Sequence, residues 1–208
     1  MSEYFVPAGS GEAEFVEKRS SFLGHVRFVE TEDAAREFIT EMKKKHYDAR
    51  HNCWCYIIRE GAVRYSDDGE PQGTAGLPML EVFKREGVEN VVCVVTRYFG
   101  GVLLGTGGLL RAYTKSAKDA LDAAGIAAVR RWVKLEAACP YSLLERMKTE
   151  CLALEGAVSD VEYGADVRMT FLLPEAKAEA FRERVTELSA GQSSAKAVGE
   201  ELMPVRVK

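Results

Sequence analysis

The stretch TRYFGGVLLGTGGLLRAY, residues 96–113, joins an apolar run to an amphipathic segment and sets the pattern of the first half of the chain. The run before it, residues 91–95, reads VVCVV, which is typical of a buried strand. Five glycines then fall within nine positions, residues 100–108, before apolar residues recur at helical spacing. The sequence therefore predicts a strand, a glycine-rich turn and a helix over residues 106–124.

Glycine-rich joints between a strand and a helix often hold phosphates, but two common nucleotide motifs are absent from this one. A P-loop requires a lysine directly after its last glycine, and no lysine follows Gly105. In a dinucleotide fingerprint, a third glycine would follow Gly105 and Gly107 at the position that Leu110 occupies. The joint therefore matches neither motif.

Two interpretations of the glycine joint remain open. The backbone N–H groups of Thr106, Gly107 and Gly108 begin a helix, where they can bind an anion, and Arg97 and Arg111 lie near in sequence. Alternatively, close packing of a strand, a turn and a helix requires small residues without any ligand.

Composition describes an ordinary globular protein. The 208 residues fit one large domain or two small ones, with 47% hydrophobic and 29% charged residues. A net charge of −4 argues against uniform coating by nucleic acid but allows a local basic patch. No apolar stretch approaches the roughly 18 residues of a membrane span, and the acidic start MSEYFVPAGSGEAEF matches no signal peptide. We therefore expect a cytoplasmic location and no membrane partner.

Cysteine and histidine usage gives little indication of a metal or a nucleophile. The five cysteines form no CxxC pair, so we expect reduced, structural thiols. His51, Cys53 and Cys55 alternate along a predicted strand and should share one face. A cysteine nucleophile or a zinc site would suit these residue types, but one strand does not supply a tetrahedral ligand set. We expect core cysteines and no metal.

The first half of the chain alternates between strand and helix periodicity. Thr31 should cap a helix that ends in the basic run from Lys43 to His46. Two strands should meet near Ser20 and Ser21. The predicted strands lie within residues 14–30, 51–60, 62–66 and 91–95, and the predicted helices cover residues 31–45, 77–85 and 106–124.

The pattern restarts near residue 131, which predicts domains at residues 1–131 and 132–208. In the second part, Ser142 should cap a helix with Glu145 completing a capping box, and Pro174 should open another helix. The expected strands are 132–141, a hairpin over 158–174, and 194–208. The order β-α-β-β-α-β is the ferredoxin-like arrangement.

The loop SDDGEPQGTAG, residues 66–76, supplies clustered carboxylates. Asp67, Asp68 and Glu70, together with His51, suggest acid–base chemistry on a phosphate- or peptide-containing substrate. However, Asp-Gly is a turn signal in its own right, and the spacing of a calcium loop is missing. Glu70 and Thr74 are instead expected to order the rim of a site.

The segment KKKHYDARH, residues 43–51, holds six basic or imidazole side chains in nine positions. A solvated helix end explains such a run most simply. If Arg50 and this run lay beside Arg97 and Arg111, they would form an electrostatic footprint for RNA. Tyr98 and Phe99 would then offer stacking surfaces, although buried aromatic residues are more common.

Three motifs in order, HNCWCY, YSDDGEPQGTAG and VVTRYFGGVLLGTGGLLRAY, resemble the IMPACT/YigZ family over residues 15–124. The second half resembles the small C-terminal domain of bacterial members. This resemblance implies an α+β N-terminal domain like domain IV of elongation factor G, with a ribosomal-protein-like β-α-β fold. It also implies a ferredoxin-like C-terminal domain that resembles domain V of that factor.

The resemblance also carries functional expectations. Eukaryotic relatives regulate translation by binding the scaffold that activates a general-control kinase, and they carry an extra N-terminal domain. Here the family core begins almost at Met1, so we do not transfer that partner. Some bacterial members have been labelled proline dipeptidases, but the metal ligands of such a hydrolase are not visible in this sequence.

We predict a non-enzymatic, translation-associated factor without a cofactor, which binds the ribosome, structured RNA or a translational protein partner. The alternative is a small hydrolase that uses Asp67, Asp68, Glu70 and His51. The loop 66–76, the end of strand 91–97 and the start of helix 106–124 should form one surface. Its predicted binding residues are Arg50, His51, Glu70, Thr74, Arg97, Tyr98, Thr106, Gly107, Gly108 and Arg111.

Overall fold

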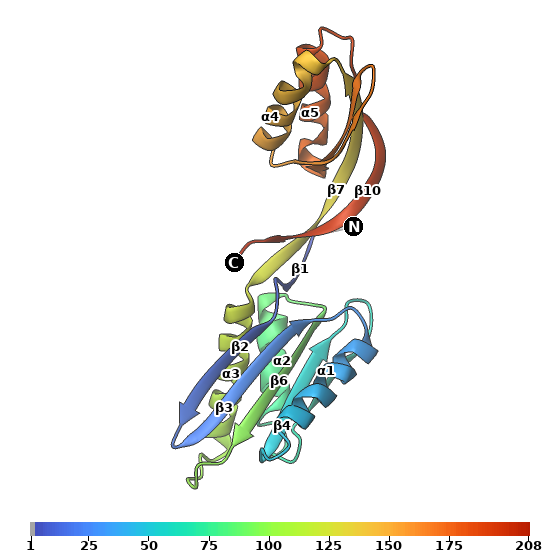
Figure 1. The fold of residues 1–208 in the computed structure, drawn as a ribbon. Coiled ribbons are helices and arrows are strands. Elements are labelled where there is room, and N and C mark those ends of the chain that lie inside the picture. Colours follow the sequence, from blue (N-terminus) through green and yellow to red (C-terminus); the bar gives the residue numbers. More distant parts are fainter. Residues whose placement is uncertain (1–2) are drawn as a thin grey trace. The chain divides into compact units, whose positions relative to one another are not determined.

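A computed structural model describes residues 3–208, which divide into two compact units (Figure 1). The N-terminal unit comprises Tyr4–Val129 and Pro204–Lys208, and the C-terminal unit contains Arg130–Met203. The sequence placed a domain boundary after residue 131. That position lies inside strand β7 (Ile126–Cys139), along which the chain passes from one unit to the other.

The N-terminal unit is built on one sheet of five antiparallel strands in the order β2-β3-β6-β4-β5. The strands are β2 (Gly11–Glu17), β3 (Ser20–Phe28), β6 (Val91–Tyr98), β4 (His51–Ile57) and β5 (Val63–Ser66). Strand β6 contains the apolar run of residues 91–95. It lies at the centre of the sheet and is buried, as predicted.

Helices cover both faces of this sheet (Figure 1). Because successive strand residues point to opposite faces, β6 contributes Val91, Cys93 and Val95 to one core and Val92 and Val94 to the other. The first core is completed by helices α2 (Gly76–Glu86) and α3 (Thr106–Ala124), and the second by α1 (Glu32–Lys45). We call these sides the α3 face and the α1 face.

The helix ends of the N-terminal unit follow local sequence rules. Thr31 caps α1 as predicted, because its Oγ1 accepts a hydrogen bond from the Ala34 N–H at 3.2 Å. Gly105 precedes α3 with φ of 73°, a conformation that favours glycine. Gly24 lets α3 approach the sheet, since a Cβ there would lie 2.5 Å from the Ser116 carbonyl oxygen.

Two features near the N-terminus differ from the sequence prediction. The first hairpin turns at Lys18 and Arg19, with φ of 46° and 68°, rather than at Ser20 and Ser21, which lie in β3. Positive φ at two long side chains leaves no compositional signal in the sequence. Strand β1 (Tyr4–Pro7) was not predicted, because its four residues pair with the start of β7, far away in sequence.

The C-terminal unit has the predicted β-α-β-β-α-β order, and its strands pair in the order β10-β7-β9-β8. Its elements after β7 are α4 (Leu144–Ala153), β8 (Ala157–Tyr163), β9 (Val167–Pro174), α5 (Glu175–Leu188) and β10 (Lys196–Arg206). Residues of α4 and α5 share one core with β7 and β9. The α+β class is thus confirmed.

The predicted capping box at Ser142 was wrong. A short 3-10 turn (Tyr141–Leu143) contains Ser142, and α4 begins at Leu144 without a side-chain cap. The Glu145 carboxylate instead accepts a hydrogen bond from the Lys148 ammonium at 2.9 Å. The 3-10 turn occupies the position at which the sequence pattern suggested a cap.

The cysteines are buried and unbonded. Cys53 and Cys55 lie in the core of the α3 face, whereas Cys139 and Cys151 lie in the C-terminal core. Burial raises the pKa of the Cys151 thiol to about 11, so the thiol is protonated at neutral pH. Among residues 3–208, no helix has the length and hydropathy needed to cross a membrane.

Candidate functional site

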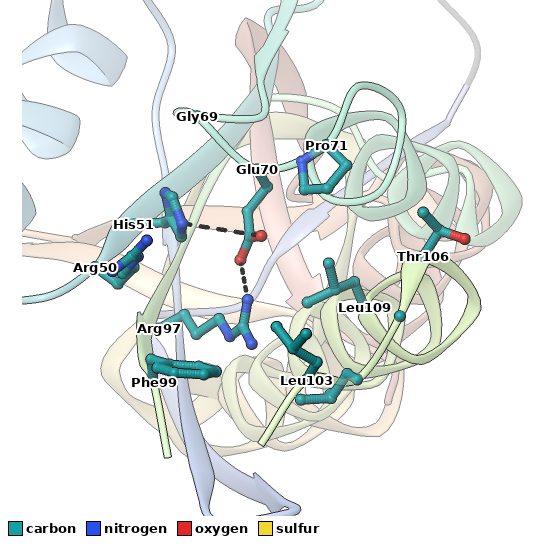
Figure 2. Close-up of a pocket in the computed structure, with 12 residues that line it drawn as sticks. Arg50, His51, Gly69, Glu70, Pro71, Arg97, Phe99, Leu103, Thr106 and Leu109 are labelled. Atoms are coloured by element: carbon teal, nitrogen blue, oxygen red, sulfur yellow. Dashed lines mark hydrogen bonds and ion pairs between the residues drawn. The ribbon is translucent and has the colours of Figure 1, made fainter. Parts of the chain in front are cut away.

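A pocket of about 470 Å³ opens on the α3 face where β6 ends and the glycine-rich segment leads into α3 (Figure 2). Its walls come from the start of β4, the loop after β5, the end of β6 and the segment before α3. The lining residues are Arg50, His51, Gly69, Glu70, Pro71, Arg97, Phe99, Leu103, Leu104, Gly105, Thr106 and Leu109.

A buried ion pair forms one wall of the pocket. The Arg97 Nη1 donates to the Glu70 Oε1 at 2.6 Å, and the two side chains are only 6% and 3% exposed. The Tyr113 hydroxyl donates to the same oxygen at 2.8 Å. Burial raises the Tyr113 pKa, which keeps that hydroxyl protonated. The Glu70 carboxylate therefore compensates the charge of Arg97, which the sequence had suggested was free for a phosphate.

His51 has a defined orientation beside the ion pair (Figure 2). Its Nδ1 lies 2.8 Å from the Asp68 carbonyl oxygen, and because a carbonyl only accepts hydrogen bonds, Nδ1 must be the donor. The other ring nitrogen, Nε2, faces the Glu70 Oε2 at 3.9 Å. The loop backbone thus aims His51 Nε2 into the pocket.

The two aspartates of the loop hold its shape. The Asp67 carboxylate accepts three backbone N–H bonds from residues 73–76, at 2.8 to 3.1 Å, and so fixes the start of α2. The Asp68 carboxylate accepts from the Asn52 N–H at 2.7 Å and from the Lys43 Nζ at 2.6 Å. Neither aspartate lines the pocket, so the hydrolase hypothesis loses two of its four residues.

The start of α3 divides the predicted anion-binding residues. Thr106 lines the pocket, whereas Gly108 and Arg111 line a neighbouring hollow of about 290 Å³. Gly107 lies between them in the first helical turn and lines neither. Leu104 lines both hollows, so Arg97 and Arg111 lie beside adjacent parts of one surface.

Two further predicted residues, Thr74 and Tyr98, also lie outside the pocket. The buried Thr74 donates its hydroxyl to the Pro71 carbonyl oxygen at 2.6 Å and thereby orders the loop. Tyr98 follows Arg97 on the same strand, so its side chain points to the α1 face. There its hydroxyl lies 3.0 Å from His46 Nδ1 and donates to Asp48 Oδ1 at 3.1 Å. Tyr98 therefore supplies no contact area in this site.

Sequence reasoning did not include Tyr113 among the predicted site residues. The available signal was chemical, since a buried tyrosine hydroxyl requires a hydrogen-bond partner. As for metals, no group of three His, Cys, Asp or Glu side chains with suitable geometry occurs in the described part of the chain.

Family models divide the chain in the same order as the fold. The Impact N-terminal domain matches residues 18–121, which contain the whole pocket. A domain of unknown function (DUF1949) matches residues 138–192 in the C-terminal unit. The chain belongs to the IMPACT family.

Relatives of the IMPACT family match over nearly the full chain. YvyE of Bacillus subtilis is 38% identical over 94% of this chain and 91% of its own length. YigZ of Escherichia coli is 32% identical over 96% of this chain and 100% of its own length. The crystal structure of a hypothetical protein matches with a TM-score of 0.60 and 30% identity, over 96% of this chain and 98% of that chain.

Proposed function

We propose that this IMPACT family member is a non-enzymatic, translation-associated factor that binds structured RNA on the ribosome with the α3 face of its N-terminal unit. The observation that carries this proposal is a set of exposed, unpaired cations beside the pocket. Within residues 3–208, neither Arg50 nor Arg111 forms an ion pair with a carboxylate, and both are exposed. Their charges are therefore available to phosphate groups.

Other cations extend this surface. Lys18, in the turn between β2 and β3, lines the same hollow as Arg111. That hollow also contains Glu17 and Lys115, whose ammonium pairs with Asp119 at 2.7 Å. The β2–β3 turn, the end of β6 and the start of α3 lie at one end of the N-terminal unit (Figure 1). This local basic surface supports RNA binding even though the chain as a whole carries a charge of −4.

The second candidate function is a hydrolase, and one observation favours it. The Asp68 carbonyl oxygen orients His51, and Nε2 of the ring, a candidate general base, lies in the pocket 3.9 Å from Glu70 Oε2. However, the other carboxylate oxygen of Glu70 is held by Arg97 and Tyr113. The described residues that line the pocket include no serine or cysteine to serve as a nucleophile.

The test is a gel shift with structured RNA and co-sedimentation with ribosomes, each over a salt series. Arg50→Ala/Arg111→Ala removes both unpaired cations and should weaken RNA binding. The slope of the logarithm of the binding constant against the logarithm of the salt concentration should become shallower by about two. Arg64→Ala/Arg85→Ala is the matched control, because it removes two exposed arginines of the same unit that line neither hollow. Equal losses in both double variants would contradict the assigned surface.

Absence of binding at low salt, for both RNA and ribosomes, would overturn the proposed function. Turnover of a panel of peptides or phosphoesters, lost in His51→Ala, would then assign the pocket to a hydrolase. Ribosome binding without any binding to free RNA would instead indicate a protein partner on the ribosome.

A further inference from the structure

Two hydrogen-bond acceptors, His51 Nε2 and Glu70 Oε2, lie next to each other in the wall of the pocket. Because His51 Nδ1 donates to the Asp68 carbonyl oxygen, Nε2 of the neutral ring carries a lone pair. Glu70 Oε2 lies 3.9 Å from it and, within residues 3–208, accepts no hydrogen bond. An amino group on the pocket side of both atoms, about 2.9 Å from each, would donate one hydrogen to each.

The walls around these acceptors suit a flat ring. Phe99 is 43% exposed and Leu103 is 82% exposed, and both line the pocket. Phe99, Leu103 and Leu109 border the space beside Arg97 (Figure 2). The pocket volume of about 470 Å³ holds a nucleobase and part of its sugar. Bases stack on such exposed aromatic rings in RNA complexes.

The charges around the pocket exclude a cationic ligand for the same acceptors. A lysine side chain of a peptide would also donate to Glu70, but Arg97 already compensates the charge of that carboxylate, and the exposed Arg50 at the pocket wall would repel a second cation. The amino group of a base is neutral and meets no such repulsion. Arg50, with Arg111 in the next hollow, is placed to contact the phosphates that flank the base.

We propose that this pocket receives one unstacked RNA base that carries an exocyclic amino group, which is adenine, cytosine or guanine, and discriminates against uracil. Uracil has no amino group: its N3–H can donate to only one of the two acceptors, and a flanking carbonyl oxygen then opposes the lone pair of the other. This proposal deepens the proposed RNA-binding function and rests on it.

The experiment measures fluorescence anisotropy with four RNA hairpins that share one stem and carry loops of adenine, cytosine, guanine or uracil alone. The wild type should bind the first three about tenfold more tightly than the uracil loop, in line with the discrimination that base contacts give. Phe99→Ala should weaken binding to those three loops by about tenfold. Tyr47→Ala, which removes an exposed aromatic residue outside the pocket, should change nothing.

Two variants alter the acceptors themselves. Glu70→Gln can keep a carbonyl oxygen toward Arg97 and Tyr113 while turning an amide N–H₂ toward the pocket, so the preference should shift toward uracil. His51→Ala removes the second acceptor without touching the buried pair. This variant should abolish the preference among loops and leave the salt dependence of binding unchanged. It tests the acceptor pair even if Glu70→Gln fails to fold.

The outcomes separate the two proposals. If the wild type binds all four hairpins equally, the base pocket is wrong while RNA binding stands. If His51→Ala retains the wild-type preference, the acceptor pair does not read the base. If no hairpin binds at low salt, the proposed function and the base pocket are both overturned.

Discussion

Buried polar side chains have different surroundings on the two faces of the N-terminal sheet. On the α3 face, Arg97 and Glu70 form a hydrogen-bonded ion pair beside an open pocket. On the α1 face, the rings of His25 and His46 lie 5.4 Å apart. His25 Nδ1 lies 3.3 Å from Glu12 Oε1, but neither nitrogen of His25, nor Nε2 of His46, has a hydrogen-bond partner within residues 3–208.

The difference shows which face holds a buried charge. Burial lowers the pKa of both His25 and His46, which favours their neutral forms. The buried guanidinium of Arg97 is instead paired with the Glu70 carboxylate at 2.6 Å. Since β6 carries Arg97 and Tyr98 at adjacent positions, one strand supplies both environments. The following predictions run from the largest expected effect to the smallest.

Arg97→Ala should lower the free energy of unfolding by about 3–5 kcal/mol, because it leaves the Glu70 carboxylate buried without its cation. Urea denaturation followed by circular dichroism measures this loss. Glu70→Leu/Arg97→Met should recover most of it, since both charges are then absent. A loss below about 1 kcal/mol in Arg97→Ala would place the pair among weak surface contacts.

Gly24→Ala should destabilise the N-terminal unit by about 1–3 kcal/mol, because the added Cβ meets the backbone of α3, 2.5 Å from the Ser116 carbonyl oxygen. Gly199→Ala is the matched control, since a Cβ there lies 3.9 Å from its nearest neighbour. Thermal unfolding of both variants tests how closely the helix packs on the α3 face. Equal melting temperatures for the two variants would contradict that packing.

Tyr98→Phe should cost about 0.5–1.5 kcal/mol, since it removes hydroxyl contacts to His46 and Asp48 on the α1 face. RNA affinity should stay at the wild-type value, because Tyr98 does not line the pocket. Anisotropy titration beside urea denaturation separates the two effects. Reduced RNA affinity at unchanged stability would move the binding surface to the α1 face.

The smallest expected effect is a decrease in the free energy of unfolding in mildly acidic solution, caused by His25 and His46. Burial lowers the folded-state pKa of His25 and His46 below the ordinary 6.5, although the Glu12 carboxylate opposes this at both residues. The unfolded chain therefore binds more protons, so this contribution to stability is complete above about pH 6.5 and declines as pH falls through the folded-state values. Lys45 adds to the lowering at both rings.

Urea denaturation at several pH values from about 7.5 to about 5.5 measures this dependence. His25→Gln and His46→Gln should each reduce the slope, because each removes one titrating ring. Wild-type stability that rises as the solution becomes more acidic would contradict the sign of both pKa shifts.

Periodicity was sufficient for most of the fold. The β-α-β-β-α-β order of the C-terminal unit and the Thr31 cap both came from local patterns, which report which face each element buries. Strand β1 escaped prediction because its stability comes from pairing with β7 and not from its own four residues. Likewise, the 3-10 turn at Ser142 shares the composition of a helix cap.

The site was only partly predictable. The sequence named Arg97, Glu70 and His51, whose side chains converge in the pocket. The sequence analysis also grouped Tyr98 with these residues, because it is adjacent to Arg97. Adjacent residues of a strand, however, point to opposite faces of the sheet. The Asp67 carboxylate accepts backbone N–H bonds at the start of α2. This role depends on the three-dimensional path of the loop, so it could not be predicted from the spacing of residues in the sequence.

The central claim is that the α3 face of the N-terminal unit binds RNA and the α1 face does not. The most direct measurement is a two-dimensional amide NMR titration of the full chain with the adenine-loop hairpin. The account predicts shifts of the Arg97 Nε–H and of the amides of Gly105 and Thr106, with residues 35–42 of α1 unchanged. Shifts confined to α1, or none at saturating RNA, would contradict it.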